Sequence, residues 1–255
     1  MKGDWTASRR AFHAALAGAV MLAASGLAAP AGAGPADRLR EGLFRRHGAE
    51  PGPPIARYVS AEGRVFVLDR TQPVPMLKFE DSPEVWALAP SPAPRGDVIY
   101  KNDLGEPVLR ITRLGGFTLF TDARPAGEPV SLVGDGSPLR LAPMSPQAVF
   151  ERLTQASLRA SRAARRPMLF EAEATPESSA LIADAAVVAS VAIIRIAQRR
   201  DGRAVLSQFD RVRFQEGRKA SATLEGGELL IVVSPRHGLA GRPSSDWIIK
   251  VARGK

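Results

Sequence analysis

The sequence lacks cysteine and has few histidine and aromatic residues. Among its 255 residues there is no cysteine, there are three histidines, and aromatic side chains make up 6%. The absence of cysteine excludes disulfides, thiolate metal sites, iron–sulfur clusters and a cysteine nucleophile. Glycine and proline, at 23 and 21 residues, stay below the level of a low-complexity chain, which excludes collagenous and wholly disordered classes. The remaining class is a globular chain of one or two domains with a sizeable core.

Lysine is also scarce, so the positive charge of the chain comes from arginine. Six lysines stand beside 29 arginines, and the formal net charge is +9. A basic surface attracts anionic partners such as lipid headgroups or lipopolysaccharide. The basic clusters lack the interleaved aromatic residues that stack bases, which argues against nucleic acid as a partner. The alternative is a solvated arginine-rich surface with no specific partner.

Residues 1–33 have the pattern of a cleavable signal peptide. A basic start precedes the uncharged stretch Ala14–Ala29, and residues 31–33 fit the small-residue cleavage pattern. The segment Ser8–Phe12 matches most of the twin-arginine export pattern. Ordinary secretion and an uncleaved N-terminal anchor are the alternatives. The pattern predicts a periplasmic or secreted bacterial protein with no transmembrane span in the mature chain.

The N-terminal half of the mature chain is predicted to be an arm followed by a β-rich module. Residues 34–54 form the arm and linker, with a short helix over Pro35–Arg46. Residues 55–133 alternate short strand patterns with turn residues and have no helical period, which predicts a small antiparallel sandwich or open barrel. The proline-rich stretch Pro90–Pro94 is interpreted as a loop. The predicted strands are Ile55–Ser60, Arg64–Arg70, Met76–Glu80, Glu84–Ala89, Asp97–Lys101, Val108–Arg113, Phe117–Thr121 and Pro129–Val133.

Residues 134–144 are a predicted linker, and residues 145–255 are predicted to form an α+β domain. The order is α-β-α-β-β-β-α, and the nearly uncharged second helix would be its buried centre. The first helix has a predicted core stripe of Val149, Phe150, Leu153, Ala156, Ala160 and Ala164. The predicted elements are helices from Pro146 to Arg166, Thr175 to Arg200 and Ser245 to Ala252, and strands Met168–Ala174, Arg211–Phe214, Ala222–Glu225 and Glu228–Ser234.

Arginines supply the candidate anion-binding residues. On the first helix of the α+β domain, four of them share a face away from the core stripe: Arg152, Arg159, Arg162 and Arg166. Arg242 precedes the last helix, whose N-terminus favours negative charge. The alternative is a surface helix whose last arginines complement the helix dipole.

Catalytic candidates are limited to one short segment. His237 lies within ten residues of Ser244 and Ser245, and a serine hydrolase would need one of these hydroxyls beside the histidine base. The G-x-S-x-G elbow is absent, and a serine pair before a helix is common helix-start chemistry. The sequence therefore gives no convincing catalytic residue. It also predicts no metal site, and it does not identify a cofactor.

Two carboxylates on a strand offer a further alternative. Glu171 and Glu173 point to one face, as the pair of acids in a glycoside hydrolase would. Arg211 and Arg213 have the same spacing on a later strand. If the two strands are neighbours, cross-strand ion pairs account for all four residues.

Three stretches carry a family resemblance: Lys78–Trp86, Gly105–Arg110 with Gly115-Gly116, and Gly241–Ser245. In these stretches the chain resembles an uncharacterised exported family of alphaproteobacteria that is catalogued only as a domain of unknown function. The resemblance covers most of the mature chain and implies no activity, cofactor or catalytic residue. The leading expectation is a non-enzymatic envelope protein that binds or scaffolds an anionic partner or another envelope protein. The alternative is a periplasmic serine hydrolase.

Overall fold

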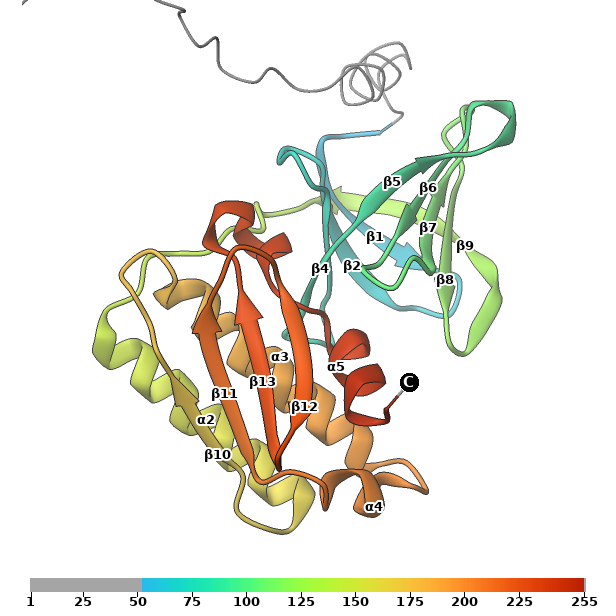
Figure 1. The fold of residues 1–255 in the computed structure, drawn as a ribbon. Helices are drawn as coiled ribbons and strands as arrows, with labels where there is room; N and C mark the ends of the chain where they lie inside the picture. The colour runs from blue at the N-terminus through green and yellow to red at the C-terminus, as the bar shows by residue number, and fades with distance from the viewer. Residues whose placement is uncertain (1–51, 255) are drawn as a thin grey trace, which may run out of the picture. The chain divides into compact units, whose positions relative to one another are not determined.

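The structure is a computed structural model that describes residues 52–254. The predicted signal peptide and nearly all of the predicted arm lie outside the described residues. Within the compact unit His47–Lys255, a large antiparallel sheet is followed by helices and a smaller sheet (Figure 1). The predicted α+β fold, with its β-rich N-terminal part, is therefore confirmed.

The large sheet has nine antiparallel strands and is nearly closed on itself. Its strand order is β4-β3-β2-β1-β9-β8-β7-β6-β5. A short 3-10 helix, η1 (Pro94–Gly96), precedes β6. The strands are β1 (Ile55–Ser60), β2 (Val65–Asp69), β3 (Met76–Phe79), β4 (Val85–Ala87), β5 (Ala89–Pro92), β6 (Val98–Lys101), β7 (Pro107–Ile111), β8 (Phe117–Thr121) and β9 (Arg124–Asp135).

The near closure comes from one stretch of chain that changes partner at Leu88. Before this point β4 pairs with β3, and the amide of Leu88 donates to the carbonyl of Pro75 at 2.8 Å. After it β5 pairs with β6, and the amide of Ala93 donates to the carbonyl of Asp97 at 2.8 Å. Successive residues of a strand direct their hydrogen bonds to opposite sides. A single extended segment therefore joins the two edges of the sheet.

The interpretation of Pro90–Pro94 as a loop is wrong, because Ala89–Pro92 is strand β5. Proline has no amide hydrogen, so within sheets it is placed mainly on edge strands, at the first residue of a strand or at bulges. The bond from Ala93 shows that odd-numbered residues of this segment face β6. Pro90 and Pro92 consequently face the open edge, where a missing amide costs no ladder hydrogen bond.

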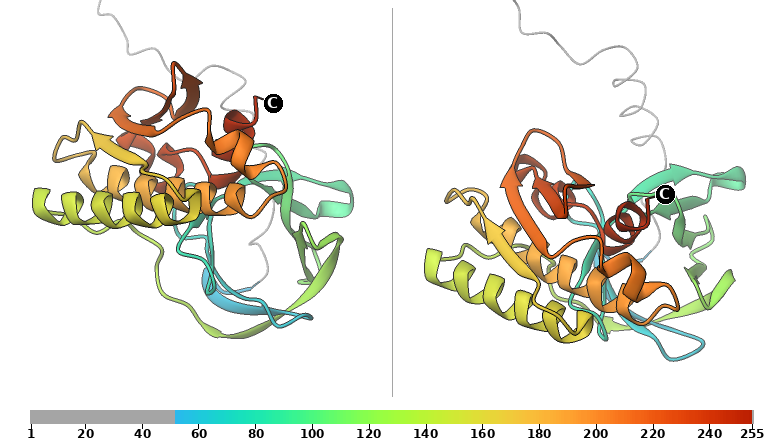
Figure 2. Two further views of the ribbon diagram at one scale, coloured as in Figure 1. Left: turned by 90° about the horizontal axis from the view of Figure 1, so that it is seen from below. Right: turned by 60° about the horizontal axis from the view of Figure 1, so that its bottom comes forward.

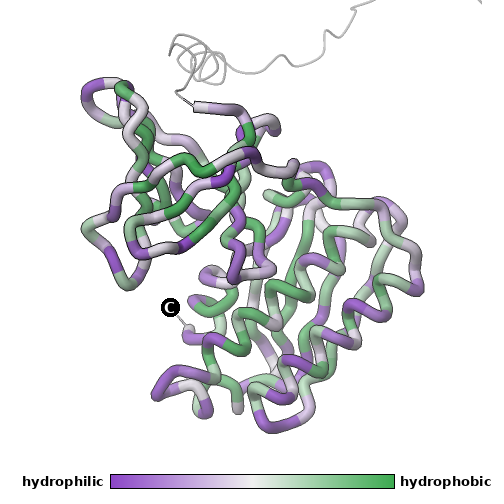
Figure 3. The backbone as a smooth tube through the Cα atoms, turned by 180° about the vertical axis from the view of Figure 1, so that it is seen from behind, coloured by the Kyte–Doolittle hydropathy of each residue, from purple (hydrophilic) through white to green (hydrophobic). Residues whose placement is uncertain are grey.

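Large apolar side chains fill the inside of the nearly closed sheet. The rings of Tyr58 and Phe66 lie 5.5 Å apart, centroid to centroid, and both side chains are buried. Figure 3 shows the alternation of apolar and polar positions along these strands. The other large side chains of this core include Leu68, Leu77, Tyr100, Leu109 and Leu119.

The α+β part has helices on one face of a four-stranded sheet. The sheet order is β10-β11-β13-β12, in which β10, β11 and β13 are parallel and β12 is antiparallel. Figure 2 shows α2 and α3 side by side against this sheet. The elements are α2 (Pro146–Ala164), β10 (Leu169–Ala172), α3 (Ser179–Ala197), α4 (Gly202–Leu206), β11 (Arg211–Glu216), β12 (Ser221–Glu225), β13 (Glu228–Val233), η2 (Pro235–Gly241) and α5 (Ser245–Ala252).

Helix α3 is the centre of this core, as its composition predicts. Most of its side chains are buried, and it contacts α2, α5, β11 and β13. Within residues 52–254 it is the one helix long and apolar enough to cross a membrane by length and composition, and 67% of that stretch is buried inside the protein. A packed core helix meets the same criteria.

The predicted core stripe of α2 is correct except at Phe150, which is 70% exposed. Val149, Ala156 and Ala160 are buried against α3. Phe150 follows Val149 and is turned about 100° away around the helix axis. That rotation takes its ring out of the interface with α3.

Candidate functional site

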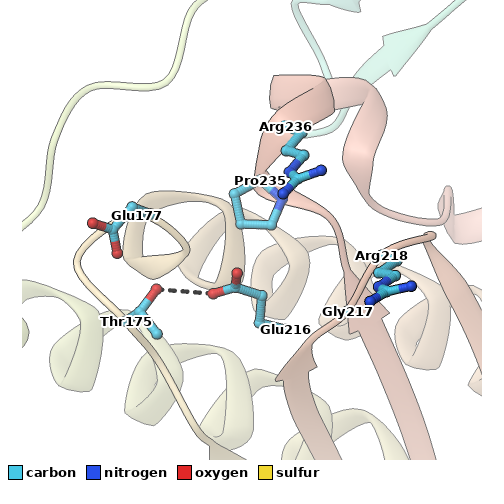
Figure 4. Close-up of a pocket in the computed structure, with 7 residues that line it drawn as sticks. All are labelled: Thr175, Glu177, Glu216, Gly217, Arg218, Pro235 and Arg236. Carbon is cyan, nitrogen blue, oxygen red and sulfur yellow. Dashed lines mark hydrogen bonds between the residues drawn. The ribbon is translucent and has the colours of Figure 1, made fainter. Parts of the chain in front are cut away.

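The carboxyl ends of the three parallel strands form one edge of the small sheet, and a pocket of about 860 Å³ lies there (Figure 4). In open α/β sheets this edge is the usual place for a ligand. We call it the sheet-edge pocket. Its lining residues are Thr175, Glu177, Glu216, Gly217, Arg218, Pro235 and Arg236.

Glycine at position 217 allows the chain to leave β11 close to β13. A Cβ atom there would lie 2.4 Å from Cγ1 of Val232, which is shorter than any real contact. The Gly217 amide donates to the carbonyl of Val233 at 2.8 Å. This approach places Arg218 near Arg236, on the same side of the pocket in Figure 4.

The sheet-edge pocket has a basic side and an acidic side. Arg218 and Arg236 are exposed and form no ion pair with any residue in the described range 52–254. Across the pocket the hydroxyl of Thr175 donates to Oε2 of Glu216 at 2.9 Å, and Glu177 lies beyond it. The pocket can therefore hold an anionic group between the arginines and accept hydrogen bonds from donor groups on the opposite side.

Sequence reasoning did not single out Arg218 or Arg236 as ligand-binding residues. Each arginine follows the end of a strand. Residues at such positions form a common ligand site only when the strands are parallel neighbours. The sequence shows three strand patterns here but not their direction or order. The pairing of β11 with β13, two strands apart in the chain, brings the two arginines together.

The four predicted anion-binding arginines do not form one exposed surface, and α2 ends at Ala164, before Arg166. Arg152 and Arg162 are exposed. Arg159 is half-buried, and its Nε has no hydrogen-bond partner among the described residues. Arg166 donates to the carbonyl of Phe209 at 2.8 Å and contacts the carboxylate of Asp210 at 3.9 Å.

Arg242 is engaged in a buried network. Its side chain is 3% exposed and donates through Nε to the Asp184 carboxylate. Nη2 donates to the carbonyl of Val85 on the free edge of β4 at 2.9 Å, and Nη1 lies 4.0 Å from Glu84. Because its guanidinium group is occupied, Arg242 joins α3 to the edge of the large sheet and is not open to an external anion.

Ser244 and Ser245 are held by carboxylates of the large sheet. The amide and hydroxyl of Ser244 donate to Asp103 at 2.7 and 2.6 Å, and those of Ser245 donate to Glu84 at 2.8 and 2.5 Å. Burial raises the pKa of Glu84, while Arg242 and the Ser245 hydrogen bonds act in the opposite direction. Both serines therefore have structural roles at the start of α5.

His237 lies beside a different serine. Its Nδ1 is 3.0 Å from Oγ of Ser234, whose hydroxyl also donates to the carbonyl of Arg218 at 3.1 Å. Among the described residues no hydrogen bond joins His237 to Ser244 or Ser245. Ser234 is 1% exposed, so its hydroxyl is closed to a substrate as well.

Of the four strand carboxylates and arginines, only Glu171 and Arg211 pair with each other as predicted. Strands β10 and β11 are parallel neighbours, and Arg211 lies 3.9 Å from Glu171. Arg213 pairs with Glu228 at 3.4 Å, and Glu173 forms no ion pair within the described residues. Within residues 52–254, no three His, Cys, Asp or Glu side chains are grouped so that they could hold a metal ion.

Comparison with known proteins identifies a family but no activity. A family model described as a domain of unknown function (DUF4908) matches residues 38–252. No curated protein and no solved structure matches the chain.

Proposed function

Since the chain belongs to the DUF4908 family, a domain of unknown function, we propose its function from its own geometry. It is an exported, non-enzymatic binding protein of the bacterial envelope, and it holds an anionic partner at the sheet-edge pocket. The partner carries donor groups beside its anionic group, as a lipid headgroup or lipopolysaccharide does.

One observation carries this proposal: two arginines that form no ion pair within residues 52–254 line a pocket at the carboxyl ends of parallel strands. Elsewhere in the described residues, arginines such as Arg110 and Arg195 are held by carboxylates. Arg218 and Arg236 keep their donors free, and the guanidinium group binds phosphate and carboxylate through paired donors. The acidic side, Glu177 and Glu216, favours a partner that also presents hydroxyl or ammonium groups.

The predicted export agrees with this partner, because the envelope displays anionic headgroups at high density. We propose that residues 1–33 direct the export and that the twin-arginine pattern sets the route. The serine hydrolase alternative stays a prediction, and no observed contact favours it.

Binding to anionic vesicles tests the proposal. The purified chain should co-sediment with phosphatidylglycerol vesicles and with lipopolysaccharide, and far less with phosphatidylcholine vesicles. Replacing Arg218→Glu and Arg236→Glu together should weaken this binding by roughly tenfold or more, since each tenfold change needs only about 1.4 kcal/mol.

A matched control separates the pocket from net charge. Arg200 and Arg203 are exposed and lie outside the pocket lining. The double variant Arg200→Glu, Arg203→Glu has the same net charge and should keep most of the binding. Equal losses in the two variants would mean that general charge, and not the sheet-edge pocket, holds the partner. The variant Arg152→Glu, Arg162→Glu tests the exposed arginines of α2 in the same assay.

A further inference from the structure

A second pocket, of about 710 Å³, lies between the large sheet and helices α3 and α5. We call it the acidic pocket. Strands β3, β4, β7 and β8 and their loops supply one wall, and Val191, Arg195 and Asp246 supply the other. It is separate from the sheet-edge pocket, with which it shares no lining residue.

Its wall on the large sheet is aromatic and apolar. Phe79, Trp86 and Phe120 line it together with Pro107, Val108 and Pro125. Phe79 is 6% exposed and belongs to the core of the large sheet, so this part of the wall is fixed by packing. An aromatic wall of this kind holds the apolar part of a ligand and attracts a cation to the ring faces.

The charge of the pocket is opposite to that of the protein. The chain has a net charge of +9, yet the pocket is lined by five carboxylates and two arginines. Both arginines are already engaged. The carboxylates are Asp81, Glu84, Glu106, Asp122 and Asp246, and the arginines are Arg64 and Arg195.

Existing contacts leave negative charge in excess. Arg64 lies over the Phe79 ring at 4.2 Å and 3.6 Å from Asp81. Arg195 lies 2.6 Å from Asp246 and 4.0 Å from Asp122. Glu106 accepts a hydrogen bond from the Asn102 amide at 3.0 Å and has no cationic partner among the described residues.

The carboxylates of Asp122 and Glu106 act electrostatically on that of Asp246. Burial raises the pKa of Asp246, Arg195 lowers it, and the charges of Asp122 and Glu106 raise it further. Asp246 lies deep, at 19% side-chain exposure, whereas Asp122 stands fully in solvent at the rim. A cation placed between them would relieve this repulsion, and its attraction would be strongest to Asp246, the partly buried member.

We propose that the acidic pocket binds an organic cation of the alkylammonium class, with its stem against Trp86 and its ammonium group among Glu106, Asp122 and Asp246. An anion is disfavoured by the net negative lining, and a bare metal ion would make no use of the aromatic wall. The inference does not depend on the sheet-edge pocket, because the two sites bind opposite charges through different residues.

Titration calorimetry on the full-length chain tests this inference. Spermidine and a trilysine peptide are the probes, since a free polyamine and a lysine side chain present the same ammonium chemistry. At least one should bind in low salt, and the tighter of the two identifies the source. The double variant Glu106→Gln, Asp122→Asn should weaken binding by roughly tenfold or more. Trp86→Leu should weaken it by a few-fold, because the stem would lose part of its apolar contact.

Two controls make the outcome decisive. Glu151→Gln removes a carboxylate from the exposed surface of α2, where its contact is to Gln147, and should leave binding unchanged. Arg218→Glu, Arg236→Glu should not weaken amine binding even if it abolishes vesicle binding. Absence of binding to both probes, or equal affinity in wild type and the Glu106/Asp122 variant, would overturn the inference.

Discussion

At the scale of single residues, Arg242 connects more of the structure than any exposed arginine described above. Its guanidinium group contacts Asp184 of α3, the carbonyl of Val85 on β4 and the nearby carboxylate of Glu84. A buried charge of this kind is stable only while its partners are present. From the sequence, the place of Arg242 before a helix suggests that it binds an external anion. In the fold, the anions that it contacts are carboxylates of the protein itself.

Replacing Arg242 should strongly destabilise the fold. Arg242→Ala leaves the buried Glu84 and the partly buried Asp184 without their cation, and removing one partner of such a network costs about 3–5 kcal/mol. Urea unfolding measures the change in the free energy of unfolding. Arg203→Ala, at an exposed position, is the matched control and should change stability by less than about 0.5 kcal/mol. A loss below about 1 kcal/mol for Arg242→Ala would contradict the role assigned to this network.

Asp97 should contribute to stability in a pH-dependent way. Hydrogen bonds from Arg110 hold the pKa of Asp97 below its ordinary value, and the amide of Arg113 adds to the effect. A lowered pKa in the folded state means that stability is gained above the ordinary value of 3.8 and lost as pH falls through the folded value.

Thermal unfolding between pH 7 and pH 2 measures this contribution. Asp97→Asn should be less stable than wild type at pH 7, and the difference should shrink as the pH falls below 4. Asp135→Asn, on an exposed residue of β9, is the control. A constant difference between Asp97→Asn and wild type across this range would show that Asp97 acts through packing and not through charge.

At the scale of elements, the segment from Val85 to Pro92 closes the large sheet by pairing with β3 first and β6 afterwards. This change of partner leaves two short free edges. Arg242 covers part of the β4 edge through the Val85 carbonyl, and Pro90 and Pro92 remove the amide donors from the β5 edge. An edge without donors is a poor template for another strand.

Restoring the amides of β5 should expose a strand edge. Pro90→Val with Pro92→Val returns two donors to the open side, so the variant should self-associate, as size-exclusion chromatography with light scattering would detect. Ser91→Val is the control, because its amide already faces β6. If the double variant kept the same mass as wild type at every concentration, the edge-protection account would be contradicted.

The secondary structure could be predicted well because hydrophobic periods differ between the two halves of the chain. The alternation over residues 55–133 and the apolar α3 both led to the correct class of element. The loop prediction for Pro90–Pro94 was wrong because proline is common both in loops and on edge strands. Only the strand that pairs with the segment distinguishes the two cases. The prediction that Phe150 is buried was wrong because the width of a buried helix face depends on the element that packs against it.

At the scale of the whole molecule, two of the three stretches that carry the family resemblance meet in space. Glu84 and Val85 from the first contact Arg242 and Ser245 from the third. These contacts join residues 157 and 161 positions apart, which no local pattern reveals. For the same reason the candidate site was not predictable, since Arg218 and Arg236 become neighbours only through the parallel pairing of β11 and β13.

Native mass spectrometry of the chain purified from its own envelope tests whether the sheet-edge pocket holds an anionic component. We expect a discrete, removable anionic adduct on the wild-type protein. The adduct should be absent from Arg218→Glu, Arg236→Glu and present on Arg200→Glu, Arg203→Glu. A bare mass for the wild type, or an adduct that persists unchanged in the Arg218/Arg236 variant, would contradict the proposal that the sheet-edge pocket holds an anionic envelope component.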